Sequence, residues 1–408
     1  MRSTPAAICV LAGLLAGALL TGCGGSGSGN GDTAAPPSPS PSATAAPATA
    51  SAAPSATTAS THRPKPAPGT TAPKPAPPAP APAGNPDGHA AVPAAARAVD
   101  TSKPTRTVGS GTAASCTSAA VVAAVAAGGV ITFDCGPRPV VITMKATAKV
   151  RNASARVVLD GGGKVTLSGG GRRRILYLDT CDQAQGWTTS HCQDQSTPEL
   201  TVQNLTFADG DSTGETAEGG GGGAILVRGG RFKAVNDRFV RNRCDRSGPD
   251  LGGAAIRVLD QYHGLPVYIT ASTFGGAAGQ GGSCSNGGAL SSIGVSWVVL
   301  NSVITYNSAV GSGANPARGG TPGGGSGGAV YTDGNLYTVR VEGSLIAHND
   351  AKEGGGAFFF VSNDRSGTLA VRRSTLHANP SHGFSTAGYP GVFFLGAGKP
   401  DVSGSTLD

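Results

Sequence analysis

One strand-like phrase returns seven times between residues 202 and 407, and this repetition restricts the chain to a repeat architecture. Each phrase mixes polar and apolar residues and closes on an apolar side chain. The closing residues, at intervals of 30 to 42 residues, are Phe207, Phe239, Phe274, Ile304, Ile346, Leu376 and Leu407. A unit of short strands and turns cannot bury a core alone, so neighbouring units must stack on one another.

Two further columns accompany the phrase. Asn follows three residues after the closing residue in four units, at Asn242, Asn307, Asn349 and Asn379. A Gly-Gly-Ala sequence then precedes an apolar strand in five units, at 222–224, 252–254, 287–289, 327–329 and 355–357. Identical residues in stacked coils lie about 4.8 Å apart, so the Asn side chains are expected to form a hydrogen-bonded ladder.

These features predict an all-β chain folded as a parallel β-helix, which is a solenoid of stacked coils. The 65 glycines weaken helices and argue against a helical enzyme. One short helix is still expected over residues 117–127, begun by an N-cap at Thr117 or Ser118 and ended by the glycines at 128–129. This helix would close the N-terminal end of the solenoid. Strands at 130–133, 140–143 and 156–159 would form the first coils, followed by a turn at Asp160.

The repeat carries a family resemblance. An apolar residue, two others and Asn, as in Phe239 to Asn242, paired with Gly-Gly-Ala, resembles the repeat of polymorphic outer-membrane proteins. The opening helix and the sequence Leu-Asp-Gly-Gly-Gly at 159–163 are similar to bacterial right-handed β-helix proteins of the pectate-lyase-like superfamily. The resemblance covers roughly residues 110–408 and implies a right-handed β-helix. It is specific for the fold and says little about function.

The N-terminal part of the sequence indicates export and a membrane anchor. Residues 1–22, with Arg2 before an apolar run at 6–20, are typical of a signal peptide. The run ends in a sequence that resembles the lipobox of bacterial lipoproteins, so Cys23 is expected to carry the lipid that binds the outer face of the cell membrane. Residues 23–105, rich in Pro, Ala, Ser and Thr, are expected to be a disordered linker that carries the β-helix domain, residues 106–408, to or beyond the cell wall.

Six cysteines remain in the domain, and an even number in an exported protein predicts disulfides. Proximity in the sequence favours the pairs Cys116–Cys135, Cys181–Cys192 and Cys244–Cys284. The alternative is a zinc site. No C-x-x-C spacing supports it.

The best acidic cluster for a metal ion lies at residues 209–218. Its candidate calcium ligands are Asp209, Asp211, Glu215 and Glu218. A calcium site with an adjacent Arg or Lys base would make the chain a polysaccharide lyase, which is the alternative function. The alternative interpretation is that these acidic side chains are solvated charges on a surface loop. The sequence lacks the ordered acidic and His motifs of polygalacturonases, and no complete acid-plus-base set appears.

In each unit the apolar residue directly after Gly-Gly-Ala is expected to point inward. Because side chains alternate along a strand, the next residue is expected to point outward. These residues include Arg257, Tyr331, Phe359 and Phe393, and the three rings would stack as an exposed stripe unless a glycine-rich loop covers them. An exposed stripe suits a sugar or a protein ligand, and Phe359→Ala would then weaken binding with little effect on stability. The preferred function is binding or adhesion to a polysaccharide or a surface partner, by a monomer that does not bind nucleic acid and needs no cofactor beyond the calcium considered above. A purely structural spacer is the third reading.

Overall fold

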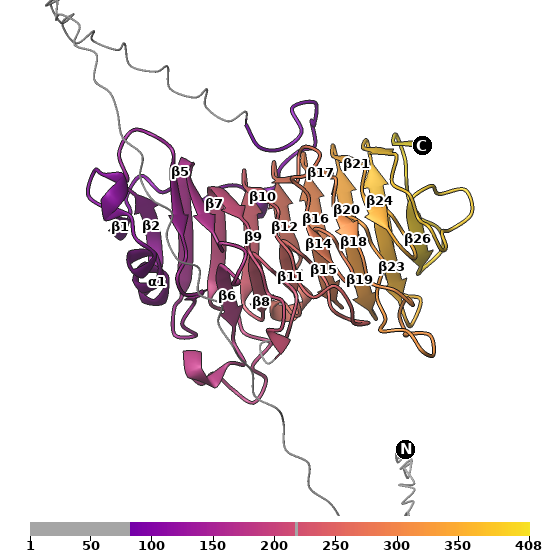
Figure 1. The fold of residues 1–408 in the computed structure, drawn as a ribbon, viewed down its shortest axis with the longest axis horizontal. Helices are drawn as coiled ribbons and strands as arrows, with labels where there is room; N and C mark the ends of the chain where they lie inside the picture. The colour runs from indigo at the N-terminus through magenta and orange to yellow at the C-terminus, as the bar shows by residue number, and fades with distance from the viewer. Residues whose placement is uncertain (1–81, 217–218) are drawn as a thin grey trace, which may run out of the picture. The chain divides into compact units, whose positions relative to one another are not determined.

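The computed structural model describes residues 82–216 and 219–408, which form a solenoid of parallel strands (Figure 1). Cys23, the signal peptide and most of the expected linker lie outside these residues. From β8 to β25 each coil contributes one strand to each of three faces, and every pairing between named strands is parallel. The all-β fold class is therefore confirmed. Among the described residues, no helix has the length and apolar character needed to cross a membrane.

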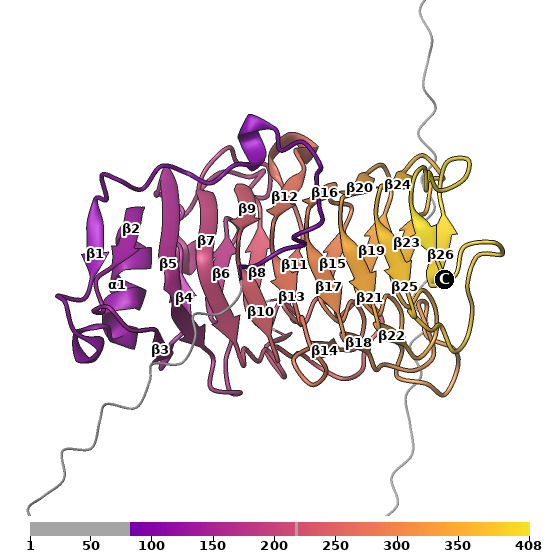
Figure 2. The same ribbon diagram turned by 90° about the horizontal axis from the view of Figure 1, so that it is seen from above.

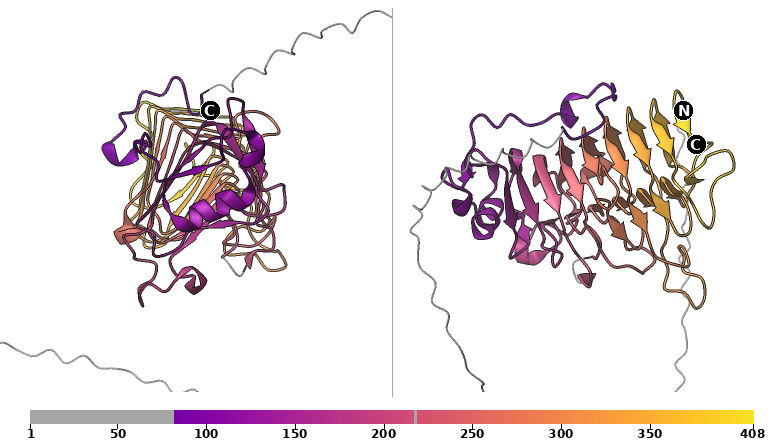
Figure 3. Two further views of the ribbon diagram at one scale, coloured as in Figure 1. Left: turned by 90° about the vertical axis from the view of Figure 1, so that its left-hand side faces the viewer. Right: turned by 45° about the horizontal axis from the view of Figure 1, so that its top comes forward.

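The three faces run the length of the stack and are seen end-on in Figure 3. The first face comprises β9 (Arg231–Val235), β12 (Val267–Thr270), β16 (Trp297–Leu300), β20 (Thr338–Glu342) and β24 (Thr368–Arg372). The second comprises β10 (Arg238–Val240), β13 (Thr273–Phe274), β17 (Val303–Thr305), β21 (Leu345–Ala347), β25 (Thr375–His377) and β27 (Thr406–Leu407). The third comprises β4 (Ala148–Lys149), β6 (Leu176–Asp179), β8 (Ile225–Arg228), β11 (Ile256–Val258), β15 (Leu290–Ile293), β19 (Val330–Gly334), β23 (Phe358–Ser362) and β26 (Val392–Leu395).

A smaller sheet lies between the second and third faces. Its strands are β14 (Ser283–Cys284), β18 (Ser308–Ala309) and β22 (Asp350–Ala351). The N-terminal coils contain β1 (Arg106–Val108), β2 (Gly129–Phe133), β3 (Val140–Thr143), β5 (Arg156–Ser168) and β7 (Glu199–Ala208). The long strands β5 and β7 join the first face to the second in one sheet.

The closing residues of the repeat phrase form the interior of the second face. Phe207, Phe239 and Phe274 stack ring on ring, with centroids 5.1 and 4.6 Å apart. Ile304 and Ile346 continue the column and are fully buried. The predicted register is thus confirmed, because one slip would turn all these side chains outward.

Two polar ladders follow this column. Asn307 Nδ2 donates to Asn349 Oδ1 at 2.9 Å, and Asn349 Nδ2 donates to Asn379 Oδ1 at 2.9 Å, as predicted. A second ladder, of serines, lies at the corner between the first and second faces. There the backbone N–H of Ser302 donates to Ser344 Oγ, and that of Ser344 donates to the serine of the next coil. Both ladders satisfy buried polar groups where the chain turns.

The N-terminal end is closed by α1 (Ser118–Ala127), as expected (Figure 3, left). Thr117 caps the helix by accepting from the N–H of Ala120 at 3.2 Å, and Gly128 ends it with a positive φ of 68°. The Cys116–Cys135 disulfide ties the start of the helix to the end of β2.

A strap, defined as residues 84–101, lies on the outside of the first face and includes the short helix η1 (Ala94–Ala96) (Figure 2). The N–H of Asn85 donates to the carbonyl of Asn301 at 2.8 Å. The Asn301 side chain both accepts from the N–H of Ala90 and donates to its carbonyl, at 2.7 and 3.0 Å. Further along, the Gln203 side chain accepts from the N–H of Val99 at 2.8 Å and donates to its carbonyl at 3.0 Å.

The strap differs from the linker expected up to residue 105. Residues 84–101 already pack against the solenoid, with Ala90 and Ala96 buried on Leu300. Alanine is the commonest residue in this stretch, as it is in the linker before it, so composition alone does not separate the two. The binding partners lie on the solenoid, in Asn301 and Gln203, where sequence composition does not show them.

Candidate functional site

The outward row on the third face runs in register along the stack. Arg257 pairs with Ser291, Ser291 with Tyr331, Tyr331 with Phe359, and Phe359 with Phe393. The ring centroids of Tyr331 and Phe359 lie 4.9 Å apart, and those of Phe359 and Phe393 lie 5.2 Å apart. The predicted stacking of the three aromatic residues is therefore confirmed.

Of the two alternatives, an exposed stripe and cover by a glycine-rich loop, the structure shows cover for two of the three rings. Tyr331 is 0 % exposed and Phe359 is 3 % exposed, while Phe393 is half-buried. The Asn315–Pro316 segment covers one side of the row and Phe384 lies edge-on to Phe359 and Phe393 from the other. Phe359→Ala should accordingly cost stability, contrary to the expectation for an outward ring.

A pocket of about 390 Å³ remains between these two covering loops. Its lining residues are Asn315, Pro316, Asp333, Phe359, Val361, Asn363, Phe384, Phe393 and Leu395. The floor is apolar because it consists of the outward residues of β23 and β26. Polar side chains at the edge come from β19, from the loop that carries Asn315 and from the turn after β23, which carries Asn363.

Asn315 and Tyr331 join two carboxylates beside this pocket. Asn315 Nδ2 donates to Asp250 Oδ1 at 2.6 Å and lies 3.1 Å from Asp333 Oδ2. It also lies 2.7 Å from the Tyr331 hydroxyl, which is 3.3 Å from Asp333 Oδ2 and 3.4 Å from Asp250 Oδ1. Asp250 Oδ1 and Asp333 Oδ2 both lie within hydrogen-bonding distance of the same nitrogen, Asn315 Nδ2. The Asn315 amide therefore bridges the two carboxylates.

Burial raises the pKa of Asp333, and the nearby charge of Asp250 raises it further, against hydrogen bonds from Gly334, Asn363 and Tyr331 that favour the ionised form. Burial also raises the pKa of the Tyr331 hydroxyl well above its usual value, so this group stays protonated near neutral pH. Within the described part of the chain, neither Asp250 nor Asp333 forms an ion pair. The cluster therefore adds negative charge to the edge of an aromatic pocket.

Arg257 is not a surface ligand-binding residue, in contrast to the sequence-based expectation. It is 5 % exposed, and its Nε and Nη1 atoms have no hydrogen-bond partner in the described residues. Burial lowers its pKa to about 10, although the charge of Asp250 acts in the opposite direction. Gly221 covers the side chain so closely that a Cβ there would lie 2.8 Å from Arg257 Cδ.

The expected calcium ligands are used in ion pairs instead. Asp209 pairs with Arg241 at 2.7 Å, and Asp211 pairs with Arg243 at 2.8 Å. Glu215 pairs with the buried Arg174 at 2.9 Å. Glu218 lies outside the described residues. No group of three or more His, Cys, Asp or Glu side chains is placed to hold a metal ion among the residues that the structure covers.

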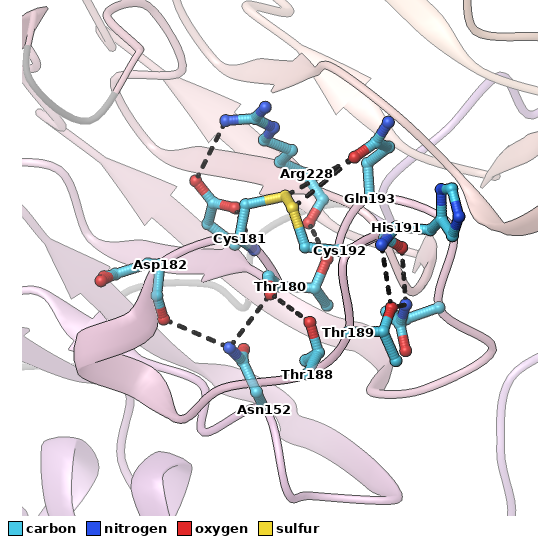
Figure 4. The surroundings of a disulfide bond; sticks show 12 residues. Asn152, Thr180, Cys181, Asp182, Thr188, Thr189, His191, Cys192, Gln193 and Arg228 are labelled. Atoms are coloured by element: carbon cyan, nitrogen blue, oxygen red, sulfur yellow. Dashed lines mark hydrogen bonds and ion pairs between the residues drawn. A yellow bond between two sulfur atoms is a disulfide. The ribbon is translucent and has the colours of Figure 1, made fainter.

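All three predicted disulfides are present, and they indicate an extracytoplasmic protein. Figure 4 shows Cys181–Cys192, which closes a loop beside the third face. Asn152 Nδ2 donates to the carbonyls of Thr180 and Asp182 in this loop, at 3.3 and 3.2 Å. The loop carries Trp187, which is 73 % exposed and was not singled out from the sequence.

Sequence reasoning also missed Asn315, Asp333, Asn363 and Phe384. One signal was present: the interval from Ile304 to Ile346 is the longest in the repeat, and the inserted residues include Asn315. Asp333 could also have been found, because it lies two residues after Tyr331 and so shares its outward face.

Comparisons with family models, with curated proteins and with solved structures each give no significant match to this chain.

Proposed function

We propose that this chain is an extracytoplasmic, lipid-anchored protein that binds a saccharide in the pocket over Phe359 and Phe393. The observation that carries the proposal is the pocket itself: stacked aromatic rings form its floor, and Asp333 and Asn363 lie at its edge. Sugars combine apolar ring faces with many hydroxyl groups. An aromatic floor with a hydrogen-bonding edge matches both properties.

The anchor and the location belong to the same proposal. A lipid on Cys23 would hold the domain at the outer face of the cell membrane, and the resemblance to outer-membrane repeats is in keeping with display at a surface. Cys23→Ala is expected to release the protein into the medium, which fractionation would measure. Retention of the variant in the membrane fraction would contradict the anchor.

A calcium-dependent lyase has weaker support. Three of the four acids expected to hold calcium are paired with Arg241, Arg243 and Arg174, and the fourth, Glu218, lies outside the described residues. The paired carboxylates Asp250 and Asp333 do not offer an alternative acid–base pair, because the Asn315 amide lies between them where a scissile bond would have to pass.

The test is a glycan array probed with the full chain, followed by affinity measurement on any ligand found. Phe393→Ala should weaken binding about tenfold or more, because the ring forms part of the floor. Phe394→Ala is the matched control: it is also half-buried on β26, but its ring stacks on Phe360 at the core. Equal losses in the two variants, or no binding to any glycan, would refute the proposed site. Growth of ultraviolet absorbance on a polyuronate with calcium would instead support the lyase.

A further inference from the structure

Most of the free polar atoms at the edge of the pocket are hydrogen-bond acceptors, and one N–H of the Asn363 amide is a free donor. Asn315 Nδ2 is used by Asp250 and Tyr331, and Asn363 Nδ2 donates to Asp333 Oδ1 at 3.1 Å. The Oδ1 atoms of both asparagines, and Oδ2 of Asp250, accept no hydrogen bond from the residues that the structure describes. A ligand that pairs these acceptors must supply donors.

The charge at this edge is negative. Asp250 is exposed and Asp333 half-buried, and neither has a cationic partner within hydrogen-bonding range among the described residues. Arg257 interacts electrostatically with Asp250 but is buried beneath Gly221. Faces of aromatic rings such as Phe393 also attract cations, because the ring quadrupole is negative above its plane.

We infer that the pocket over Phe359 and Phe393 takes a sugar that bears a positively charged amino group. This inference rests on the proposed saccharide-binding function and specifies its ligand class. An ammonium group supplies three donors to the acceptor-rich edge, offsets the two carboxylates and favours the aromatic floor. A uronate would bring a third carboxylate to the same place and is disfavoured by like-charge repulsion.

The net charge of the whole chain opposes binding of a cationic sugar. A measured preference for such a sugar would therefore have to arise at the pocket itself. The formal net charge is +7, so a non-specific electrostatic effect would favour anionic glycans. A preference for a cationic sugar must then come from local groups such as Asp250 and Asp333.

The experiment compares three oligosaccharides of equal length by calorimetry on the full chain near neutral pH: oligomers of glucosamine, of N-acetylglucosamine and of galacturonate. The glucosamine oligomer should bind about tenfold more tightly than its acetylated counterpart, and the galacturonate oligomer least tightly. Added salt should weaken glucosamine binding, because it screens the attraction.

Two variants assign the preference to the site. Asp250→Asn removes one exposed charge and keeps an oxygen for Asn315, so the preference for glucosamine should fall about threefold to tenfold. Asp87→Asn removes another exposed charge, from the strap on the first face, and should leave the preference unchanged.

The outcomes separate the inference from the function beneath it. If acetylated and free amino sugars bind equally well and Phe393→Ala weakens both, the saccharide site stands and the amino-group inference fails. If none of the three oligomers binds, the inference fails, and the glycan array decides the proposed function. A preference for glucosamine that survives Asp250→Asn and Phe393→Ala places the binding elsewhere and overturns the inference.

Discussion

The first and third faces share the same coils and the same register, yet their outer surfaces differ. On the first face, the outward residues Tyr268 and Val298 are covered by the strap, which places Val92 and Ala96 against them. On the third face, Phe359 and Phe393 are covered by two separate loops that leave a pocket between them. The apolar row on the first face is thus covered by the strap, whereas the row on the third face remains partly open to solvent.

This difference shows that the repeat determines the interior and that segments outside the repeat determine the surface. Stacking forces like residues into register on every face, so each face acquires an outward row of comparable character. Whether a row becomes packing or a site depends on the segment that crosses it. The five predictions below perturb the shared interior first and then each outer surface.

Ile304→Asp should have the largest effect, because it places an unpaired charge in the interior on which both faces depend. The free energy of unfolding should fall by several kcal/mol, measured by denaturant titration with the fluorescence of the buried Trp297. Leu336→Asp, at a position that is 72 % exposed, is the control and should melt almost as the wild type does. A wild-type-like Ile304→Asp would show that the register is wrong.

Phe359→Ala should cost about 3–5 kcal/mol, because it removes a buried ring between Tyr331 and Phe393. Denaturant titration measures the loss. Phe393→Ala should cost clearly less, since that ring is half-buried. Equal small losses in both variants would indicate that the covering loops leave the row open.

Asn301→Gly and Asn363→Ala should separate the two outer surfaces. Asn301 has a positive φ of 51°, and glycine keeps that backbone while losing the bonds to Ala90, at a cost of about 1–2 kcal/mol to the strap. Amide exchange over residues 84–101 should speed up without a change in saccharide affinity. Asn363→Ala should weaken saccharide affinity and leave amide exchange over residues 84–101 unchanged. Coupled effects in either variant would mean that the faces are not independent.

Arg257→Met should raise stability by about 1 kcal/mol, because a buried guanidinium with unpartnered Nε and Nη1 atoms is replaced by an apolar side chain. The melting temperature measures the change. Arg257→Lys, which keeps a buried charge, should give no such gain. A destabilised Arg257→Met variant would reveal a compensating interaction with Asp250.

Acid should affect the two faces with opposite sign, and this is the smallest effect. Burial disfavours ionised Asp160, but hydrogen bonds from Asn204, Thr101, Gly162 and Gln203 outweigh it and lower its pKa below the usual 3.8. The stability that Asp160 gives the first face is full above that value and lost as the pH falls through its folded pKa.

Asp333, on the third face, has a raised pKa, so its protonation as the pH falls relieves a penalty there. Amide exchange near Thr101 and near Tyr331, followed from neutral pH into acid, should therefore diverge. Thr101→Val should reduce the acid response of the strap. Parallel responses at the two places would contradict these assignments.

The repeat made the interior predictable. Ile304, Ile346 and the Asn307–Asn349 pair lie where the phrase places them, because a period shared by many coils leaves one consistent register. The three disulfides followed from short separations within single coils or between neighbouring ones. The orientation of Tyr331 and Phe359 was also predictable from alternation along a strand.

The environment of those outward residues was not predictable. Asn315 and Phe384 come from loops without a repeat, and glycine-rich loops carry little information about where they fold. The strap was hidden for a related reason: its contacts are mostly backbone hydrogen bonds to Asn301 and Gln203, which leave no pattern in residues 84–101 themselves.

The course of the strap also has a mechanical consequence. Within the described residues, the first hydrogen bonds of the strap are those of Gly84 to Thr273 and of Asn85 to Asn301, in the middle of the stack and not at its first coil. Tension applied from the N-terminal side would therefore load the Gly84–Thr273 bond first and the bonds of Asn301 next, and would detach the strap progressively toward Val99. Each freed residue lengthens the tether by roughly 3.3 Å before any load reaches α1. The strap would therefore detach and extend under tension before the solenoid begins to unwind.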